Sequence, residues 1–480
     1  MGFRAGVAAL LLGCVGCGTP QGKPDLAITY NRSAAFEAPD RNPIIAIPGL
    51  LGSKLRDEAS QAMVWGAFDM LSVDPDSPEG LRLLSLPIGA GDEPLAQLRD
   101  RVEPYEVLDR ARVTIFGIPI ELEVYAGILA TLGVGGYRDE ALGLAGEIDY
   151  GDDHFTCFQY PYDWRRDIVE SAQRLMQFVR EKQTYVRAQY RERYGVENAD
   201  VKFDIATHSM GGLVARYFLM YGDQDLPADG SLPELTWAGA AYVERVIFVG
   251  TPNAGSVEAF ENLVNGKSLG PLMPLFSPSL IGTYPSTYQL LPRSRHGLVV
   301  WDGDLEQPVE DLMDPDLWAR SEWGLAAPNQ DRLLTMLMPD VADADERRRR
   351  AISLQARILH RAAALHAALD RPAAPPDGLD MLLVAGDGHR TPKIASVSSQ
   401  TGDVAVIEYG DGDGTVLRSS ALMDERVGGP WSPRVKTPIG FHSVLFLPEE
   451  HINLTKIITF RDNILFWLLE DPRGDTRADG

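Results

Sequence analysis

One serine lies at the junction between an expected strand and an expected helix. Val201 to Ala206 alternates apolar and polar residues, which predicts a strand, and residues 213–221 read as a helix. Between them stands Thr207-His208-Ser209-Met210-Gly211-Gly212. A sharp turn here would raise the Ser209 hydroxyl above the sheet at a helix amino terminus, where small neighbours are needed because backbone crowds backbone. A serine hydroxyl is a weak nucleophile, so it also needs a base that an acid orients.

The order strand, Ser-x-Gly, helix resembles the nucleophile elbow of α/β-hydrolases, although Thr207 occupies the position where glycine is commonest. In those enzymes an acidic residue and then a histidine follow the serine along the chain. His451 lies just before the last expected helix, where this fold carries its histidine, and His442 is a nearby rival. We therefore take His451 as the candidate base.

A glycine-rich segment supplies the candidate acid. Gly410-Asp411-Gly412-Asp413-Gly414-Thr415-Val416 follows an expected strand, and its small residues let a loop turn a carboxylate toward an imidazole. Asp413 is the preferred acid, with Asp411 and Asp387 as alternatives. The same Asp/Gly pattern is also typical of a plain turn or of a loop that binds a cation.

Two backbone N–H groups are needed to stabilise the oxyanion of an acyl-transfer intermediate. One should come from Met210, the residue after the nucleophile. The other should come from Leu50, in the Pro48-Gly49-Leu50 turn that follows the first expected strand. Only the backbone N–H groups act at these positions, so the identity of the side chains indicates the shape of the turn and says nothing about the reaction.

The rest of the chain alternates strands with helices, which predicts an α/β fold with a mostly parallel, doubly wound sheet. The expected strands are residues 42–47, 155–160, 201–206, 246–249, 381–385 and 404–407. The expected helices are residues 122–132, 168–194, 213–221, 344–369 and 452–469. Four prolines and Gly282 interrupt the apolar stretch 269–291, so no long helix is expected there.

A division of the chain follows from these elements. It comprises a signal peptide (1–17), a tether (18–40), the first part of a hydrolase core (41–255, with a lid insertion at about 61–150), a cap insertion (256–376), the second part of the core (377–470) and a tail (471–480).

Composition excludes several classes of protein. A 480-residue chain that is 45% hydrophobic can bury a large core, so wholesale disorder is excluded. The net charge of −23 argues against a nucleic-acid partner, because phosphate binding needs a cationic face. Three cysteines exclude a disulfide scaffold.

The amino terminus resembles a bacterial lipoprotein signal. A short positive start is followed by the apolar run Ala5 to Leu12 and then by small residues around Cys14 and Cys17. In such signals a cysteine is acylated and becomes the first mature residue. The leucine three residues before Cys14 fits a lipoprotein signal better, whereas cleavage before Cys17 gives a signal of more usual length. We favour Cys17 as the acylated residue and keep Cys14 as the alternative. An ordinary cleaved signal peptide is the other interpretation.

Taken together, the motifs resemble those of the lecithin:cholesterol acyltransferase family, which includes lysosomal phospholipase A2 and phospholipid:diacylglycerol acyltransferase. The matching stretches, in family order, are PIIAIPGLLGSKL (43–55), VW (64–65), YDWR (162–165), ATHSMGGLVARYF (206–218), GTPNAGS (250–256), YQLLP (288–292), YGDGDGTV (409–416) and EEHINL (449–454).

The resemblance implies an α/β-hydrolase fold with an inserted cap and lid and a triad of Ser209, Asp413 and His451. It also implies oxyanion donors at Leu50 and Met210, and it places Trp65 near the acyl site on a mobile lid. The long cap at residues 256–376 matches poorly.

The implied activity is a lipid acyl-ester reaction in which the acyl group passes to an alcohol or to water, with no cofactor or metal. A lipidated cysteine would keep such an enzyme at a bacterial membrane, beside its lipid substrate. The alternative is a non-enzymatic surface lipoprotein that retains an inactive hydrolase fold. Decayed enzymes usually lose a triad residue, and this chain retains all three candidates.

Overall fold

The computed structural model describes residues 26–68, 75, 77–91, 93–115, 118–123, 125–268 and 275–473. Cys14 and Cys17, the two candidates for lipidation, lie outside the described residues. Within the described ranges, no helix combines the length and the apolar character needed to cross a membrane.

A six-stranded sheet forms the centre of the molecule, and every neighbouring pair of its strands is parallel. In spatial order the strands are β17 (Ser443–Leu447), β14 (Asp380–Gly386), β10 (Val243–Val249), β9 (Phe203–His208), β1 (Ile44–Ile47) and β8 (Cys157–Gln159). The predicted α/β fold with a doubly wound, parallel sheet is therefore confirmed, and the fold is that of an α/β-hydrolase.

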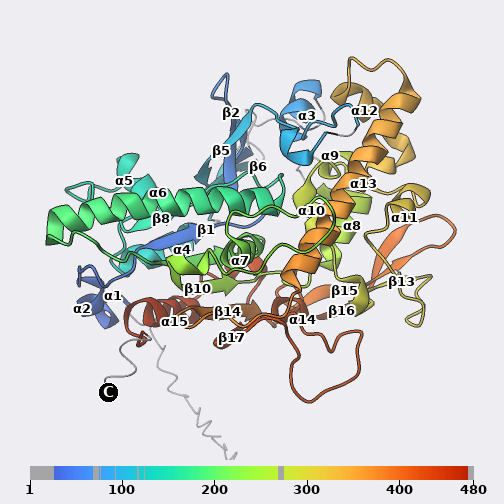
Figure 1. Cartoon of the computed structure of the whole chain (residues 1–480). Coiled ribbons are helices and arrows are strands. Elements are labelled where there is room, and N and C mark those ends of the chain that lie inside the picture. Colours follow the sequence, from blue (N-terminus) through green and yellow to red (C-terminus); the bar gives the residue numbers. More distant parts are fainter. Residues whose placement is uncertain are drawn as a thin grey trace, which may run out of the picture.

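The two faces of this sheet are covered by different helices (Figure 1). Because strand side chains alternate between faces, Ile45 and Ile47 belong to one core cluster, and Ile44 and Ala46 belong to another. The first face packs against α6 (Ile168–Tyr194) and α7 (Gly211–Tyr221), and the second against α4 (Ala126–Val134) and α15 (Ile458–Leu469). Both faces are buried, as the nearly continuous apolar runs of parallel strands require.

Helix α6 has the bounds that its sequence predicts. The Asp167 side chain accepts a hydrogen bond from Val169 N–H at the amino end, and Gly195 ends the helix with a left-handed φ of 69°. The last helix, by contrast, begins at Ile458 and not at the expected residue 452. Residues His451–Asn453 form a short 3-10 turn, because the N–H of His451 donates outside the helix to Asp413 O at 2.8 Å.

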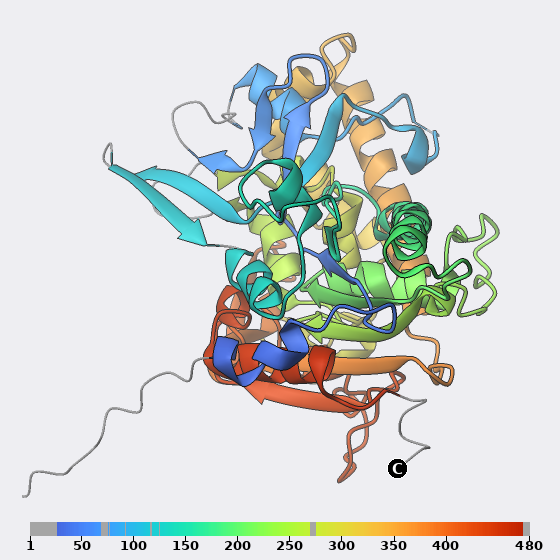
Figure 2. The same ribbon diagram turned by 90° about the vertical axis from the view of Figure 1, so that its left-hand side faces the viewer.

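The first insertion follows β1 and is richer in strands than the sequence suggests. One small sheet has the order β3 (Met63–Trp65), β2 (Ser53–Asp57), β5 (Val102–Val107), and another has β4 (Ala67–Phe68), β6 (Arg110–Ile115), β7 (Ile118–Glu123). Helix α3 (Pro78–Leu84) lies between β4 and β5 in the sequence. Helix α5 (Glu140–Leu144) follows α4. Figure 2 shows the antiparallel strands β6 and β7, in cyan, standing out from the body.

The second insertion is mainly helical and lies on the right-hand side of the molecule in Figure 1. Its elements are α8 (Val257–Asn265), β11 (Lys267–Ser268), β12 (Leu275–Phe276), α9 (Pro278–Ile281), α10 (Pro285–Gln289), β13 (Val299–Trp301), α11 (Pro315–Arg320), α12 (Asp331–Leu337) and α13 (Ala344–Leu369). Within its described residues, the proline-broken stretch forms β12 and the short helices α9 and α10, and no long helix, as expected.

The strand expected at residues 404–407 does not enter the central sheet. It is part of β16 (Val404–Gly412), which pairs antiparallel with β15 (His389–Val397), and β15 also pairs with β13. The burial of β16 alternates along its length, so one face meets solvent, which an antiparallel hairpin tolerates and a central parallel strand does not. The edge position of the central sheet, next to β14, is taken by β17, which sequence reasoning missed; α14 (Arg418–Leu422) lies between β16 and β17 in the chain.

Two short helices, α1 (Leu26–Thr29) and α2 (Asn31–Ala34), fall within the segment predicted as a tether. Leu26 and Tyr30 pack against Leu465 of α15, and the Tyr30 hydroxyl donates to Asp462 Oδ1 at 2.9 Å. This part of the segment is therefore attached to the body of the protein.

The amino ends of the central strands carry paired charges. The fully buried Arg245 of β10 contacts Asp380 Oδ2 at 3.0 Å and Asp471 Oδ2 at 2.9 Å. Nearby, Arg473 binds both carboxylate oxygens of Asp204, at 2.8 and 2.7 Å. These pairs attach the end of the described chain to β9, β10 and β14.

Candidate active site

Ser209 stands at the carboxyl end of β9, where the chain turns into α7. Its φ of 52° lies in the left-handed region, which residues other than glycine rarely adopt. Its N–H donates to Val249 O of β10 at 2.8 Å, which fixes the turn to the neighbouring strand. Such strain is stored at functional sites and matches a nucleophile elbow.

The tightness of this turn explains its glycines. A Cβ atom on Gly211 would lie 2.3 Å from Pro48 O, and one on Gly212 would lie 2.0 Å from Thr251 Oγ1. A Cβ on Gly49 would come within 2.7 Å of the Ser209 Cβ. Thr207, which stands where glycine is commonest, is buried and donates its hydroxyl to Ile247 O at 3.2 Å, so this position accommodates a side chain.

His451 and Asp413 form a pair at the same edge of the sheet, with the Asp413 side chain buried and the His451 side chain 16% exposed. The His451 Nδ1 lies 2.7 Å from Asp413 Oδ2, and its backbone N–H donates to Asp413 O. The other carboxylate oxygen of Asp413 accepts from the N–H groups of Val416 at 2.7 Å and Thr415 at 3.0 Å. The carboxylate is thereby fixed, and it leaves His451 Nε2 as the ring nitrogen that can take up a proton.

The His451 ring approaches the nucleophile turn from the side of β10. A Cβ on Gly250 would lie 3.0 Å from His451 Cε1, and Gly250 follows Val249, the residue that holds the Ser209 N–H. Ser209 and His451 also line one cavity. The structure thus brings Ser209, Asp413 and His451 to one place.

Each member of the acid–base pair changes the pKa of the other. Burial alone would lower the pKa of His451, but the Asp413 carboxylate, with a smaller contribution from Glu258, raises it above its ordinary value. Burial would raise the pKa of Asp413, yet the His451 ring and the two backbone N–H donors hold it below its ordinary value. Asp413 therefore stays ionised when His451 accepts a proton.

The turn that carries Leu50 follows β1 and is closed by a bond from Gly52 N–H to Gly49 O at 3.1 Å. In the described part of the chain, neither the Leu50 N–H nor the Met210 N–H has a hydrogen-bond acceptor. Unpaired backbone donors beside a nucleophile are what an oxyanion hole requires. Leu50 also lines the same cavity as Ser209.

The YDWR segment, residues 162–165, holds this turn in place through hydrogen bonds to its backbone. The Tyr162 hydroxyl donates to Pro48 O at 3.0 Å, and Trp164 Nε1 donates to Ser53 O at 3.1 Å. The buried Arg165 in turn binds Asp163 through two nitrogens, at 2.9 and 2.8 Å. These bonds hold both ends of the turn from Pro48 to Ser53.

An apolar cavity of about 450 Å³ opens beside these groups. Its apolar walls include Trp65 of the first insertion, Trp164 of the core and four residues of the second insertion, Phe276, Ile281, Tyr284 and Leu290. Trp65 is buried, packs edge-on against Trp164 with ring centroids 5.3 Å apart, and donates its Nε1–H to Leu51 O at 2.9 Å. Trp65 therefore both lines the cavity and supports the residue after Leu50. Glu258 and Lys267 form an ion pair on the same wall.

The alternative site residues lie elsewhere. His442 immediately precedes β17, and its Nδ1 accepts the N–H of Met381 at the start of β14. In a parallel sheet this is the amino-end edge, so about 15 Å of strand separates His442 from the edge that carries Ser209. Asp411 is exposed, and Asp387, at the end of β14, has no described contact with His451.

Sequence reasoning missed two polar residues of the site, His208 and Tyr125. The His208 ring lies 4.7 Å from the His451 ring, measured between centroids, and its Nδ1 lies 3.0 Å from the Tyr125 hydroxyl. The place of His208 directly before Ser209 was a usable signal. Nothing local marks Tyr125, which reaches the site from the amino end of α4.

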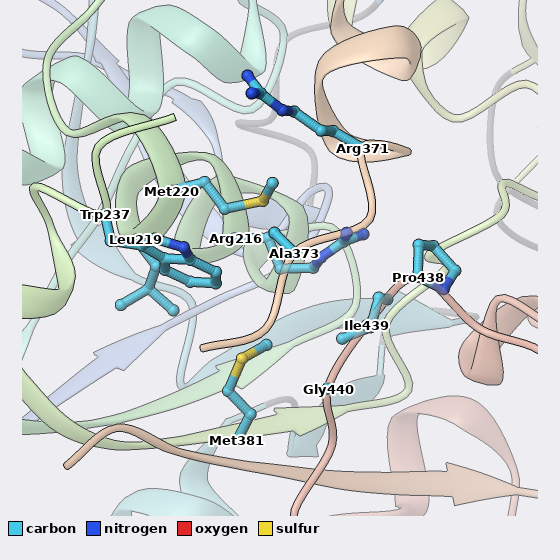
Figure 3. Close-up of a pocket in the computed structure, with 10 residues that line it drawn as sticks. All are labelled: Arg216, Leu219, Met220, Trp237, Arg371, Ala373, Met381, Pro438, Ile439 and Gly440. Atoms are coloured by element: carbon cyan, nitrogen blue, oxygen red, sulfur yellow. The ribbon is translucent and has the colours of Figure 1, made fainter. Parts of the chain in front are cut away.

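A second hollow lies between α7 and β14 and has a volume of only about 10 Å³ (Figure 3). That is room for about one water molecule. Its Arg216 side chain is already bound to Asn253 Oδ1 at 3.0 Å and Leu369 O at 2.7 Å. Among the described residues, no three His, Cys, Asp or Glu side chains are grouped so as to hold a metal ion.

Comparison with known structures supports the fold. The chain is similar to a chain in the crystal structure of the Tle4–Tli4 complex, with 15% identity, a TM-score of 0.53 and coverage of 89% of this chain and 98% of that one. The lin2722 product of Listeria innocua (10% identity, TM-score 0.27, 91% and 96% covered) and EstA of Clostridium botulinum (11%, 0.33, 91% and 88%) also match, with scores too low to bear on fold or function. No curated protein matches the chain significantly.

A family model matches part of the sequence. Residues 123–317 match the model described as lecithin:cholesterol acyltransferase. The matched part contains Ser209 but neither Asp413 nor His451. The match supports an enzyme of the lipid esterase or acyltransferase type. Over residues 123–317, this α/β-hydrolase thus carries the resemblance to the lecithin:cholesterol acyltransferase family that its motifs predict.

Proposed function

We propose that the protein is a serine-dependent lipid acyl-ester enzyme that forms an acyl-enzyme on Ser209. The observation that carries the proposal is one juxtaposition. The strained Ser209, the Leu50 turn and His451, which is paired with the buried Asp413, line one apolar cavity of about 450 Å³, and the N–H groups of Leu50 and Met210 lack acceptors among the described residues. An ester with a long acyl chain fits such a site, since the chain can occupy the apolar space while its carbonyl meets Ser209.

In the first half-reaction, Ser209 Oγ attacks the ester carbonyl while His451 Nε2 takes the hydroxyl proton. The carbonyl oxygen becomes an oxyanion and accepts hydrogen bonds from the N–H groups of Leu50 and Met210. Asp413 holds the ring through Nδ1 and stabilises the imidazolium. The C–O bond to the leaving alcohol then breaks, and His451 returns the proton to that alcohol.

In the second half-reaction, water or an acceptor alcohol gives its proton to His451 Nε2 and attacks the acyl-serine. The new C–O bond forms as the bond to Ser209 Oγ breaks, and the proton returns to the serine. Water yields a fatty acid and an alcohol yields a new ester. The alcohol prevails only where a dry wall raises its effective concentration, and here the apolar wall around Trp65 and Phe276 would do so.

Reaction with a fluorophosphonate probe tests the proposal against the alternative of an inactive surface lipoprotein. The probe labels only an activated serine, so the wild-type protein should be labelled and Ser209→Ala should not. Absence of labelling in folded wild-type protein would favour the alternative.

Lipid mass spectrometry distinguishes the two products. We propose incubation with phosphatidylcholine and a rising concentration of a long-chain alcohol or sterol. A transferase forms ester at the expense of free fatty acid at constant total turnover. If fatty acid stays the sole product at saturating alcohol, the enzyme is a lipase or phospholipase.

We also propose that the chain is exported and tethered to a bacterial membrane through an acylated Cys17, or Cys14. The support is the apolar run and the small residues around both cysteines. Metabolic labelling with a fatty acid should mark the wild-type protein and not the variant with both cysteines changed to Ser. A soluble, unlabelled wild-type protein would exclude the anchor.

A further inference from the structure

A chain of three hydrogen bonds runs behind the candidate triad. The Gly49 N–H donates to the Tyr125 hydroxyl oxygen at 2.7 Å. That hydroxyl lies 3.0 Å from His208 Nδ1, and His208 Nε2 lies 3.0 Å from the backbone oxygen of His451. The chain therefore joins the turn that carries Leu50, the residue before Ser209 and the loop that carries His451.

With a neutral His208 ring, only one arrangement of protons satisfies all three bonds. A carbonyl oxygen can only accept, so His208 Nε2 carries the hydrogen and donates it to His451 O. In a neutral ring, Nδ1 is then an acceptor, and it takes the hydroxyl hydrogen of Tyr125. The Tyr125 oxygen still has a lone pair, which accepts the Gly49 N–H.

Burial keeps this chain uncharged. Both Tyr125 and His208 are buried, and burial, with a further contribution from the neighbouring His451, lowers the pKa of His208 to about 3. Burial also raises the pKa of Tyr125. Beyond His451, the charged groups that His208 faces are Asp413 and Lys456. A neutral His208 adds no positive charge beside the imidazolium that forms on His451 during turnover.

The packing makes the chain rigid. The Tyr125 and His208 rings meet edge to face with centroids 5.5 Å apart, and His208 in turn lies against the His451 ring. A Cβ on Gly49 would lie 3.1 Å from His208 O, so the two strand ends are in close contact here as well. Moving either ring would shift the turn or the loop to which it is bonded.

We infer that Tyr125 and His208 are positioning residues, which hold the Leu50 turn and the His451 loop in register with Ser209. The inference rests on the proposed function, since it assigns both residues a part in that reaction. Neither touches the reacting atoms. They act because Leu50 directly follows the bonded Gly49, and because His208 binds the backbone of the base itself.

Tyr125→Phe tests the chain with the smallest change, since it removes one oxygen atom and retains the ring. It leaves the Gly49 N–H and His208 Nδ1 without partners, and kcat for a soluble ester should fall about 10- to 100-fold with little change in KM. The matched control is Tyr221→Phe, which removes a buried hydroxyl that donates to Ala368 O at 2.8 Å, away from the site. The control should retain wild-type kcat.

Two substitutions at His208 separate its two bonds. His208→Asn places an amide near the position of Nδ1 and can keep the bond to Tyr125. His208→Gln places an amide near the position of Nε2 and can keep the bond to His451. Each should retain more kcat than His208→Ala, which keeps neither bond. In a double variant, Tyr125→Phe should cost less in the His208→Gln background than it costs alone, because the bond that the two residues share is already lost and only the bond from Gly49 N–H remains to be removed.

The pH profile separates positioning from a charge effect. Since His208 is neutral in the working range, His208→Asn should leave the acid limb of kcat/KM in place and lower only the plateau. Three results would overturn the inference: wild-type kcat in Tyr125→Phe, losses that follow thermal stability alone as in Tyr221→Phe, or an acid limb displaced by a pH unit in His208→Asn. An inactive wild-type protein would instead refute the proposed function.

Discussion

At the amino ends of the central strands, Arg245 and Arg473 are each held by carboxylates, and their charges are satisfied within the fold. At the carboxyl ends, the polar groups are aimed at a cavity. The N–H groups of Leu50 and Met210 lack acceptors among the described residues, and Ser209 sits in a strained turn. The same sheet thus presents a closed set of charges at one edge and an open set of polar groups at the other.

This difference separates the residues that stabilise the fold from the residues that are expected to take part in the reaction. A polar group whose partners are all within the protein lowers the free energy of the folded state, and its loss is felt on unfolding. A group that is prepared for a partner outside the protein contributes to catalysis, and removing it need not weaken the fold. Substitutions at the carboxyl-end edge should therefore affect turnover, and substitutions at the amino-end edge should affect unfolding.

The largest effect is expected at the open edge, from Ser209→Ala. Loss of the nucleophile should reduce turnover about 10⁶-fold. Stability should hardly change, because alanine keeps the N–H that donates to Val249 O. Ester turnover and thermal unfolding measured on one preparation check both halves, and a folded variant that turns over at the wild-type rate would show that the nucleophile is another residue.

Asp413→Asn should have the next largest effect, about 10⁴-fold on kcat, because the imidazole loses its orientation. The pH profile should change as well. Asp413 raises the pKa of His451 against the opposite effect of burial, so removal of its charge lowers that pKa. Since the base must be neutral, the acid limb of kcat/KM should move to lower pH. Asp411→Asn, on the exposed neighbour, is the matched control and should leave the limb unmoved; an unshifted limb in both variants would contradict the pairing.

Arg245→Met probes the closed edge. It leaves Asp380 and Asp471 without their buried partner, and we expect the free energy of unfolding to fall by about 3 kcal/mol. The exposed pair of Arg191 with Glu197 provides the control, since Arg191→Met should cost only about 0.5 kcal/mol. Denaturant titration gives both values, and activity per folded molecule should be unchanged. A loss of activity without a loss of stability would remove the distinction between the two edges.

Trp65→Ala should have a smaller effect that depends on the substrate. The indole lines the apolar cavity, so the variant should lose about tenfold in kcat/KM for long-chain esters and less for acetates. Trp431, which is 83% exposed, supplies the control substitution Trp431→Ala. An equal loss on every chain length would mean that Trp65 acts through its bond to Leu51 and not through the acyl chain.

The smallest effect is expected from His442→Gln. His442 lies at the amino-end edge, so turnover should stay within about twofold of wild type if distance from Ser209 decides the outcome. Comparison with His451→Gln under the same conditions completes the test. Should His442→Gln be the more damaging of the two, the assignment of the base would have to be exchanged.

Local patterns predicted the parts of the fold that depend on local chemistry. The apolar run at β1, the alternation at β9 and the stop at Gly195 each have a direct physical meaning, and the structure contains all three. The elbow around Ser209 was recognisable for the same reason, since Gly211 is required by contacts with the backbone at the end of β1 and Gly212 by contacts with the Thr251 side chain.

What sequence reasoning missed depends on partners that are distant in the chain. The edge strand β17 is short and half exposed, although its apolar run from Val444 to Leu447 was a usable signal. Strand β16 was assigned to the wrong sheet, because its pairing with β15 follows from a hairpin that only the folded chain reveals. Tyr125 and His208 are 83 residues apart, and no local signal joins a tyrosine at a helix start to a histidine at a strand end.

The position of His451 has a consequence for synthesis. The sheet strands β1, β8, β9, β10 and β14 are all complete by residue 386, yet the acid and the base come later in the chain. Any nascent chain that ends before residue 451 therefore holds the nucleophile without its base. Under the proposed function, a lipid-cleaving activity would be absent from growing or truncated chains, and it would arise only once the loop before α15 has been made and folded against β16.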